Sequence, residues 1–184
     1  MSELPKGWVR ASLGTLTDAR YGEGFAMKDL TESGFPVFGA NGQVGFFSRY
    51  THEESEVLVT CRGATCGTVN ISLPNSFVTS NSFIVVPRNR DVLEKSFLRY
   101  CLEAADTKSF ITGTAQPQIT LANFNPYEVP VPPLNEQRRI VAKLEALQAR
   151  SRRARAALDA VPPLLEKLRQ SILAAAFRGD LTKD

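Results

Sequence analysis

Apolar residues recur in alternating steps of four and three through the last quarter of the chain. This spacing keeps one narrow seam on the same side of a helix for five heptads, and only Ser151 interrupts its apolar character. The seam consists of Ile140, Leu144, Leu147, Ser151, Ala154, Leu158, Val161, Leu165, Leu168, Ile172 and Ala175. Since no upstream segment predicts a second helix of matching length, we expect the chain to dimerise, or to dock onto a larger assembly, through this seam.

The signals at the ends of this helix place it over residues 134–179, followed by a short tail at 180–184. Asn135 is the predicted N-cap, and Gly179 is the predicted stop. Pro162-Pro163 interrupts the interior, because proline removes backbone hydrogen bonds and clashes with the preceding turn. The heptad phase continues through both prolines. The sequence therefore predicts either one helix kinked there or two collinear helices that share the seam.

Residues 1–133 predict a separate head domain of short strands and turns. Runs rich in Val, Ile, Phe and Thr, bounded by Gly, Pro and Asn-Gly, predict strands at 36–39, 43–48, 57–62, 68–72, 82–87 and 127–131. Asn41-Gly42 is a strong hairpin signal. A helix is predicted over 92–105 with Asp91 as its cap, and a shorter helical turn after Thr120. The predicted fold class is α+β, a small mixed α/β head followed by a long coiled-coil helix.

The composition narrows the class of protein. At 184 residues and 43% hydrophobic, the chain has room for one compact domain and an appendage, and it carries no run long enough to span a membrane. The first residues lack an apolar signal core, so we expect a cytoplasmic protein. Cys61, Cys66 and Cys101 are expected to be buried, reduced thiols, and His52 in its charged stretch is expected at the surface. These four residues form no zinc pattern, and we expect neither a metal nor a cofactor on this chain.

Charge is distributed unevenly between the two parts of the chain. Residues 1–133 carry 11 basic and 13 acidic groups, a balance of −2, whereas residues 134–184 carry 11 basic and 6 acidic groups, a balance of +5. The basic excess is concentrated in Arg150, Arg152, Arg153 and Arg155. This cluster predicts either a solvated helix face or a stripe that binds phosphates or a partner subunit.

Polar side chains gather in the loops of the head. Amides, hydroxyls and a guanidinium are the groups that read base edges, since Asn and Gln pair with adenine and Arg pairs with guanine. The candidate DNA contacts are Asn41, Gln43, Arg62, Thr65, Thr79, Asn81, Lys108, Thr114, Gln116 and Gln118. Lys28, Arg49 and Lys108 are candidate phosphate contacts.

Catalytic chemistry has little support in the sequence. Asn125-Pro126-Tyr127 resembles the Asn-Pro-Pro-Tyr element of amino-methylating enzymes but lacks its second proline. The glycines at 39–45 lie among predicted strands and do not open a helix, as a nucleotide-binding fingerprint requires. No carboxylate pair is spaced for acid–base work, so we expect a protein without catalytic residues.

Six blocks in order resemble the specificity subunits of type I restriction–modification systems. They lie at residues 4–14, 38–46, 57–67, 114–119, 131–141 and 171–181. The most specific is VPPLNEQRRIV at 131–141, where the head ends and the long helix begins. The resemblance identifies 1–133 as a target recognition domain and 134–179 as a conserved-region helix.

The resemblance also implies partners. Family members usually carry two recognition domains and two helices, whereas this chain has one of each and is either a half-subunit or half of a longer protein. Two copies pairing antiparallel would read the two halves of a bipartite DNA site. The implied partners are a modification subunit, which holds S-adenosylmethionine and methylates adenine, and a restriction subunit. An alternative stays open: an adaptor that binds modification subunits without reading DNA.

Overall fold

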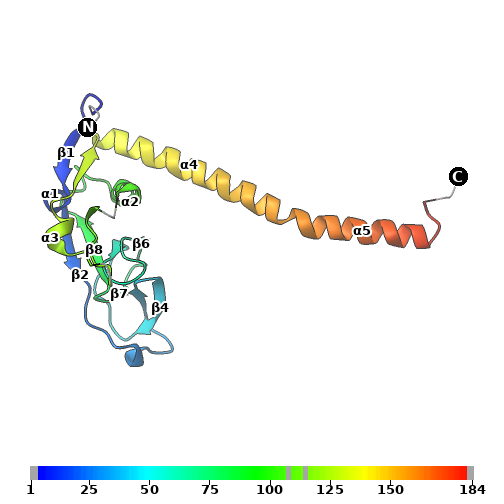
Figure 1. Cartoon of the computed structure of the whole chain (residues 1–184), viewed down its shortest axis with the longest axis horizontal. Coiled ribbons are helices and arrows are strands. Elements are labelled where there is room, and N and C mark those ends of the chain that lie inside the picture. Colours follow the sequence, from blue (N-terminus) through cyan, green and yellow to red (C-terminus); the bar gives the residue numbers. More distant parts are fainter. Residues whose placement is uncertain (1–3, 107–108, 114–115, 182–184) are drawn as a thin grey trace. The chain divides into compact units, whose positions relative to one another are not determined.

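The computed structural model describes residues 4–106, 109–113 and 116–181 of the chain. The chain divides into two compact units, Met1–Val141 and Ala142–Asp184. The first unit holds every strand and the short helices, and the second holds most of the long C-terminal helices (Figure 1). The first two turns of the long helix therefore belong to the compact head, rather than beginning a separate unit at residue 134.

Short strands of the head form three sheets. A pair joins β1 (Val9–Ser12) to β9 (Glu128–Val131), so both ends of the head meet. The four-stranded sheet has the antiparallel order β2 (Thr17–Tyr21), β8 (Ser82–Pro87), β5 (Val57–Thr60) and β6 (Val69–Ile71). The three-stranded sheet has the order β4 (Gly42–Phe47), β3 (Phe35–Gly39) and β7 (Phe77–Val78), with β3 parallel to β7. The expected mixed α+β class is confirmed.

Helical segments of the head are short. They are α1 (Leu13–Leu16), the 3-10 turn η1 (Met27–Asp29), α2 (Lys95–Ala104) and α3 (Leu121–Phe124). Thr120 caps α3 by accepting a hydrogen bond from the Asn123 amide, which confirms the helical turn expected there. The predicted start of α2 is wrong. Glu94, not Asp91, accepts from the Phe97 amide at 2.7 Å and caps the helix, so it begins three residues later.

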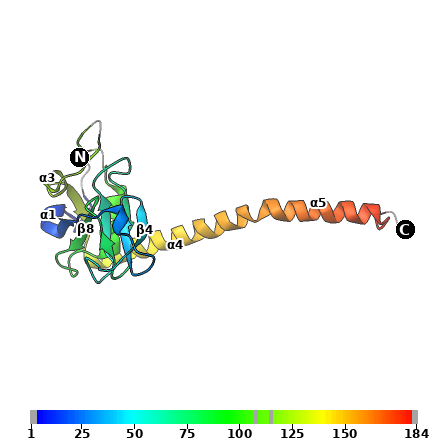
Figure 2. The ribbon, with the colours of Figure 1, turned by 90° about the horizontal axis from the view of Figure 1, so that it is seen from below.

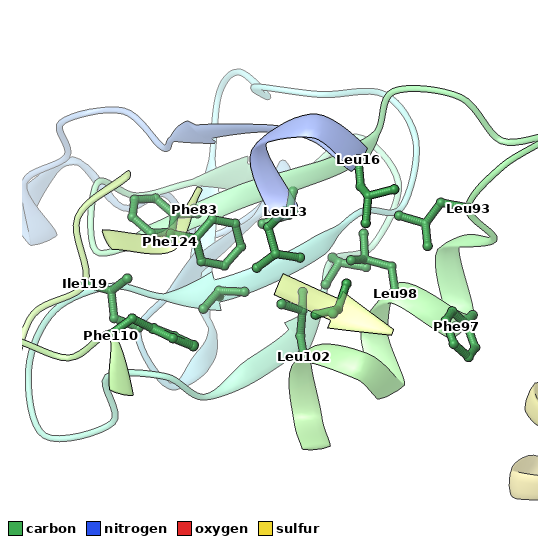
Figure 3. Packing of buried hydrophobic residues seen from close by; sticks show 14 of the residues in the cluster. Leu13, Leu16, Phe83, Leu93, Phe97, Leu98, Leu102, Phe110, Ile119 and Phe124 are labelled. Carbon is green, nitrogen blue, oxygen red and sulfur yellow. The ribbon is translucent and has the colours of Figure 1, made fainter. Parts of the chain in front are cut away.

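The main core lies where α2 and the short helices pack against the four-stranded sheet. Leu13 and Leu16 of α1 face Leu98 and Leu102 of α2, and further along Phe124 of α3 packs against the sheet (Figure 3). The apolar side chains that α1, α2 and the strands of the sheet contribute to this cluster are almost completely buried. Burial of such side chains stabilises the fold by about 1.5–3 kcal/mol each. The cluster therefore holds the strands and helices of the head in place, and with them the ends of the loops that connect them.

His52 is buried, so its expected place at the surface is wrong. Only 8% of its surface is exposed, and its ring nitrogens lie 2.7 Å from the Ser72 hydroxyl and 3.0 Å from the Thr51 hydroxyl. Burial, aided by the positive charges of Arg20 and Lys95, lowers the pKa of His52 to about 4. The ring is therefore neutral at pH 7 and links the loop before β5 to the end of β6.

Gln137 anchors the first turn of the long helix to the head. Its side chain is completely buried, with 0% of its surface exposed. The side-chain carbonyl accepts a hydrogen bond from the Glu94 amide at 2.9 Å, and the amide donates to the carbonyls of Val92 and Pro132, both at 2.8 Å. One polar side chain thus satisfies three backbone groups, which fixes the start of the helix against the beginning of α2.

Two helices form the C-terminal part of the chain, α4 (Leu134–Asp159) and α5 (Val161–Phe177). They follow one another end to end and together span 44 residues with a bend of 27° (Figure 2). Pro162 and Pro163 lie in the first turn of α5, where a missing amide hydrogen costs least. The helix begins at Leu134, so Asn135 is not the N-cap that its sequence suggests.

Gly179 ends α5 as the sequence predicts. Its φ of +72° lies in the left-handed region, which glycine adopts without steric cost. Its amide donates to the Ala176 carbonyl at 3.0 Å, and the Asp180 amide donates to the Ala175 carbonyl at 2.9 Å. This pair of bonds is the Schellman arrangement, which closes the helix and turns the chain away from its axis.

Candidate functional site

A polar cleft of about 530 Å³ opens among the loops of the head. The loops come from the β3–β4 hairpin, the segment after β5, the segment before β8 and the segment before α3. The lining residues are Ala40, Arg62, Gly63, Asn81, Gln116, Pro117 and Gln118. Four of the ten candidate DNA contacts predicted from the sequence, Arg62, Asn81, Gln116 and Gln118, therefore meet in one cleft, although they come from three separate loops.

Backbone hydrogen bonds fasten these loops to one another. Arg62 and Gln118 form an isolated antiparallel bridge, and the Gly63 amide donates to the Pro117 carbonyl at 3.1 Å. The Cys61 amide donates to the Asn81 carbonyl at 2.8 Å. Since each bond joins neighbouring loops of the cleft wall, the polar side chains project from a backbone whose position is already set.

The hairpin turn of β3 and β4 is held against the same wall through one carbonyl. The carbonyl of Ala40 accepts hydrogen bonds from the hydroxyls of Thr60 at 2.8 Å and Thr65 at 3.3 Å. Gly42 has a φ of +90°, as the Asn-Gly hairpin signal predicts. Thr65 is therefore occupied in supporting the cleft and also stands at its border.

The charge of the cleft favours a ligand that forms hydrogen bonds and carries negative charge next to its hydrogen-bonding groups. Among the lining residues that the structure describes, Arg62 is the one charged side chain, and no carboxylate is present. Arg62 can only donate, whereas Asn81, Gln116 and Gln118 can both donate and accept. This donor and acceptor set fits the edges of base pairs.

The remaining predicted contacts lie in different settings. Asn41 and Gln43 are exposed at the hairpin, next to the cleft residue Ala40. Thr79 is buried, so its side chain offers little surface to a ligand, and we leave it out of the cleft. Lys108 and Thr114 lie outside the described residues.

The two other candidate phosphate contacts differ in their surroundings. Arg49 forms an ion pair with Glu23 at 2.7 Å and lies over the ring of Phe77. Lys28 is exposed in η1. Arg49 therefore already has a carboxylate partner that a phosphate would have to replace.

The cysteines offer no nucleophile for this cleft. Burial raises the pKa of Cys61 to about 11 and that of Cys101 to about 12, and it also raises the pKa of Cys66. Cys61 is buried and the other two are half-buried, so the expectation of full burial fits only the first. Within the described ranges, no group of His, Cys, Asp and Glu is placed to hold a metal ion.

The seam on α4 and α5 forms a second candidate surface. Leu147, Leu158, Val161, Leu165, Leu168 and Ile172 are all exposed, and Leu158 exposes 70% of its surface. Ile140, Leu144 and Ala175 are half-buried, and Ile140 packs against the main core of the head. Within the described part of the chain, no helix is long and apolar enough to cross a membrane. An uncovered apolar strip of this length is characteristic of a protein-binding surface.

Known proteins resemble the chain over nearly its whole length. A family model described as "Type I restriction modification DNA specificity domain" matches residues 5–157. The chain belongs to this family. The match covers the polar cleft, the anchoring glutamine and most of α4.

Individual relatives agree with this assignment. The EcoDI specificity subunit of Escherichia coli is 25% identical over 99% of this chain and 40% of its own length. The EcoKI specificity subunit of Escherichia coli strain K12 is 24% identical over 98% of this chain and 45% of its own length. The crystal structure of the HsdS subunit from Thermoanaerobacter tengcongensis is 28% identical, with a TM-score of 0.73 over 97% of this chain and 47% of its own. The chain thus spans about half the length of these specificity subunits.

Proposed function

We propose that this chain is a non-catalytic DNA-recognition subunit whose head reads one half of a bipartite site. Membership of the specificity family and the polar cleft support this proposal together. The observation that carries it is the gathering of Arg62, Asn81, Gln116 and Gln118 in one cleft with no carboxylate among its described lining residues. A carboxylate in the cleft would repel the phosphates of DNA and weaken binding, and none of those lining residues carries a carboxylate.

The chemistry of the cleft suits direct reading of bases in the major groove. A guanidinium pairs with the two acceptors of guanine, and an amide pairs with the donor and acceptor of adenine. Each good bidentate pair discriminates against the wrong base by about 1–3 kcal/mol. The backbone hydrogen bonds between the loops reduce the conformational entropy that is lost on binding, because the backbone of the loops is already ordered and only the side chains have to be fixed.

Two copies of the chain supply the two halves of the site. The relatives are about twice as long, and the exposed seam is suited to pair with the same seam on a second copy. An antiparallel pair relates the two heads by a two-fold axis, so they read the same sequence on opposite strands. The length of the paired helices then sets the spacer between the half-sites.

Catalysis belongs to partner subunits in this proposal. A modification subunit holds S-adenosylmethionine and methylates DNA, and a restriction subunit joins through the complex. Arg150, Arg152, Arg153 and Arg155 are exposed on α4 and carry most of the basic excess of the helices. We assign this cluster to contact with the modification subunit, because none of the four arginines lines the cleft and an exposed positive face suits an acidic protein surface.

Selection from a random DNA pool tests the proposal. The full chain is mixed with its modification subunit, and bound DNA is recovered and sequenced. We expect enrichment of an interrupted palindrome, since two identical heads read symmetric half-sites. Enrichment of a single uninterrupted half-site would contradict the dimer, and complex formation without any enriched sequence would favour the adaptor instead.

A further inference from the structure

The seam on α4 and α5 pairs with itself completely in one antiparallel register. In that register Leu158 of one copy faces Val161 of the other, and Leu144 faces Ala175. All ten seam positions from 144 to 175 then meet a seam position of the second copy. The two-fold axis passes beside Ala160, the residue between the two helices.

The head closes the seam at the start of α4. Gln137 occupies the seam position that precedes Ile140, and its side chain is buried and hydrogen-bonded inside the head. A partner helix therefore cannot continue along the seam beyond Ile140. In the complete register Ile140 faces Gly179 of the second copy, which is the residue that turns the chain out of α5. The helix stop and the edge of the head thus coincide.

A shallow groove of about 260 Å³ lies on the head at the first residues of α4. Its lining is mainly apolar and consists of Gly7, Val9, Asp91, Val92, Val131, Pro132, Pro133 and Leu134. Val9 and Val92 are exposed, and Val92 exposes 49% of its surface. Pro133 continues the spacing of the seam, four residues before Gln137. The groove therefore lies where the seam would run if the head did not interrupt it.

We propose that the turn after α5 docks in this groove on a second copy, with Leu181 seated beside Val92. Leu181 is exposed and is the apolar residue that follows the glycine stop. The inference rests on the antiparallel dimer proposed above. Phe177 is also exposed, but it lies on the helix face opposite the seam and points away from the partner.

The chain can reach the groove. Arg178 ends the helix opposite Val141 of the second copy, and from Val141 back to Leu134 a helix spans about 10 Å. Val92 is nearer still, because its carbonyl accepts a hydrogen bond from Gln137, and from Val141 back to Gln137 a helix spans about 6 Å. The three residues from Gly179 to Leu181 form the turn that follows α5, so they cover less than the roughly 10 Å of an extended chain but enough for this distance. Each dimer holds two such contacts. They hold the end of α5 of each copy against the head of the other copy, and they cover the exposed apolar residues of both grooves.

Cross-linking between two variants, each with one added cysteine, tests the docking. Chains carrying Val92→Cys are mixed with affinity-tagged chains carrying Leu181→Cys and treated at pH 7 with a short bismaleimide. The native thiols react slowly there, because burial raises the pKa of Cys61 to about 11 and that of Cys101 to about 12, and it also raises the pKa of Cys66. Leu73→Cys replaces Val92→Cys as the control, since both native side chains expose 49% of their surface on the same head.

The expected result is a cross-linked pair of chains whose yield exceeds that of the Leu73→Cys control by about tenfold, from the higher local concentration. Sedimentation of the same samples distinguishes the possible failures. A dimer without preferential cross-linking overturns the docking and leaves the proposed dimer intact, whereas a monomer overturns both. A double variant of Val92→Cys and Leu181→Cys that cross-links within one chain also overturns docking on a second copy.

Discussion

Replacing Gln137 by leucine should destabilise the head, although the new side chain is apolar and similar in size. The change removes three hydrogen bonds and leaves the Pro132 carbonyl without its partner in a buried place, and the Glu94 amide and the Val92 carbonyl without theirs in half-buried places. Each orphaned group costs about 1–3 kcal/mol. Allowing for the apolar surface that leucine buries, we expect a net loss of about 3 kcal/mol.

Equilibrium unfolding in urea measures this loss. Trp8, the single tryptophan of the chain, lies in the head and reports its unfolding by fluorescence. A loss of about 3 kcal/mol lowers the urea midpoint by about 1–2 M at a typical slope. Gln170→Leu is the matched control, because Gln170 is exposed and its amide donates a long hydrogen bond to Glu166, at 3.4 Å. If both variants shift the midpoint equally at one protein concentration, the anchoring role of Gln137 is refuted.

Three further predictions concern the seam, the buried histidine and the cleft. Leu144→Asp combined with Leu165→Asp should give monomers in sedimentation, since unpaired buried charge costs several kcal/mol; an intact dimer would mean that the seam is assigned wrongly. Stability should fall by up to about 1.4 kcal/mol per pH unit as the pH drops from 6.5 towards 4, because the unfolded chain protonates His52 at its ordinary pKa of 6.5 and the folded chain only at about 4. His52→Gln should flatten urea midpoints over that range, and an unchanged slope would exclude the histidine as the cause. Arg62→Ala or Gln118→Ala should weaken DNA binding by about 1–3 kcal/mol and relax one base position in a selection, whereas equal weakening on all sequences would identify a phosphate contact.

Local signals in the sequence predicted much of the fold. Ser82–Pro87 was predicted with its observed bounds, because an unbroken apolar run between turn residues has few alternatives. The Asn-Gly hairpin and the end of α5 at Gly179 depend on backbone conformations that few residues tolerate, so the sequence predicted both. The first two strands were missed, since Val9–Ser12 and Thr17–Tyr21 are largely exposed edge strands whose pattern is weak without their partners.

Other features depend on contacts that no local pattern encodes. His52 is buried because Ser72, twenty residues away, supplies a partner for its ring. Glu94 displaces Asp91 as the cap of α2, since the Gln137 side chain holds the Glu94 amide from a distance of 43 residues in sequence. The residue types of the cleft could be predicted, but not which of them meet. That grouping is set by backbone bonds between the loops, such as the bridge of Arg62 with Gln118 and the bond from the Cys61 amide to the Asn81 carbonyl.

Pro162 and Pro163 give the pair of helices α4 and α5 a soft point, a place where the helix bends more easily than elsewhere. Neither proline can donate to the carbonyl four residues earlier, so the backbone carbonyls of Leu158 and Asp159 lack that helical bond. Bending stiffness is lowest where such bonds are missing, and here the bend of 27° already marks the place. In the proposed symmetric pair both soft points fall near the middle, so we expect the assembly to bend there rather than at its ends.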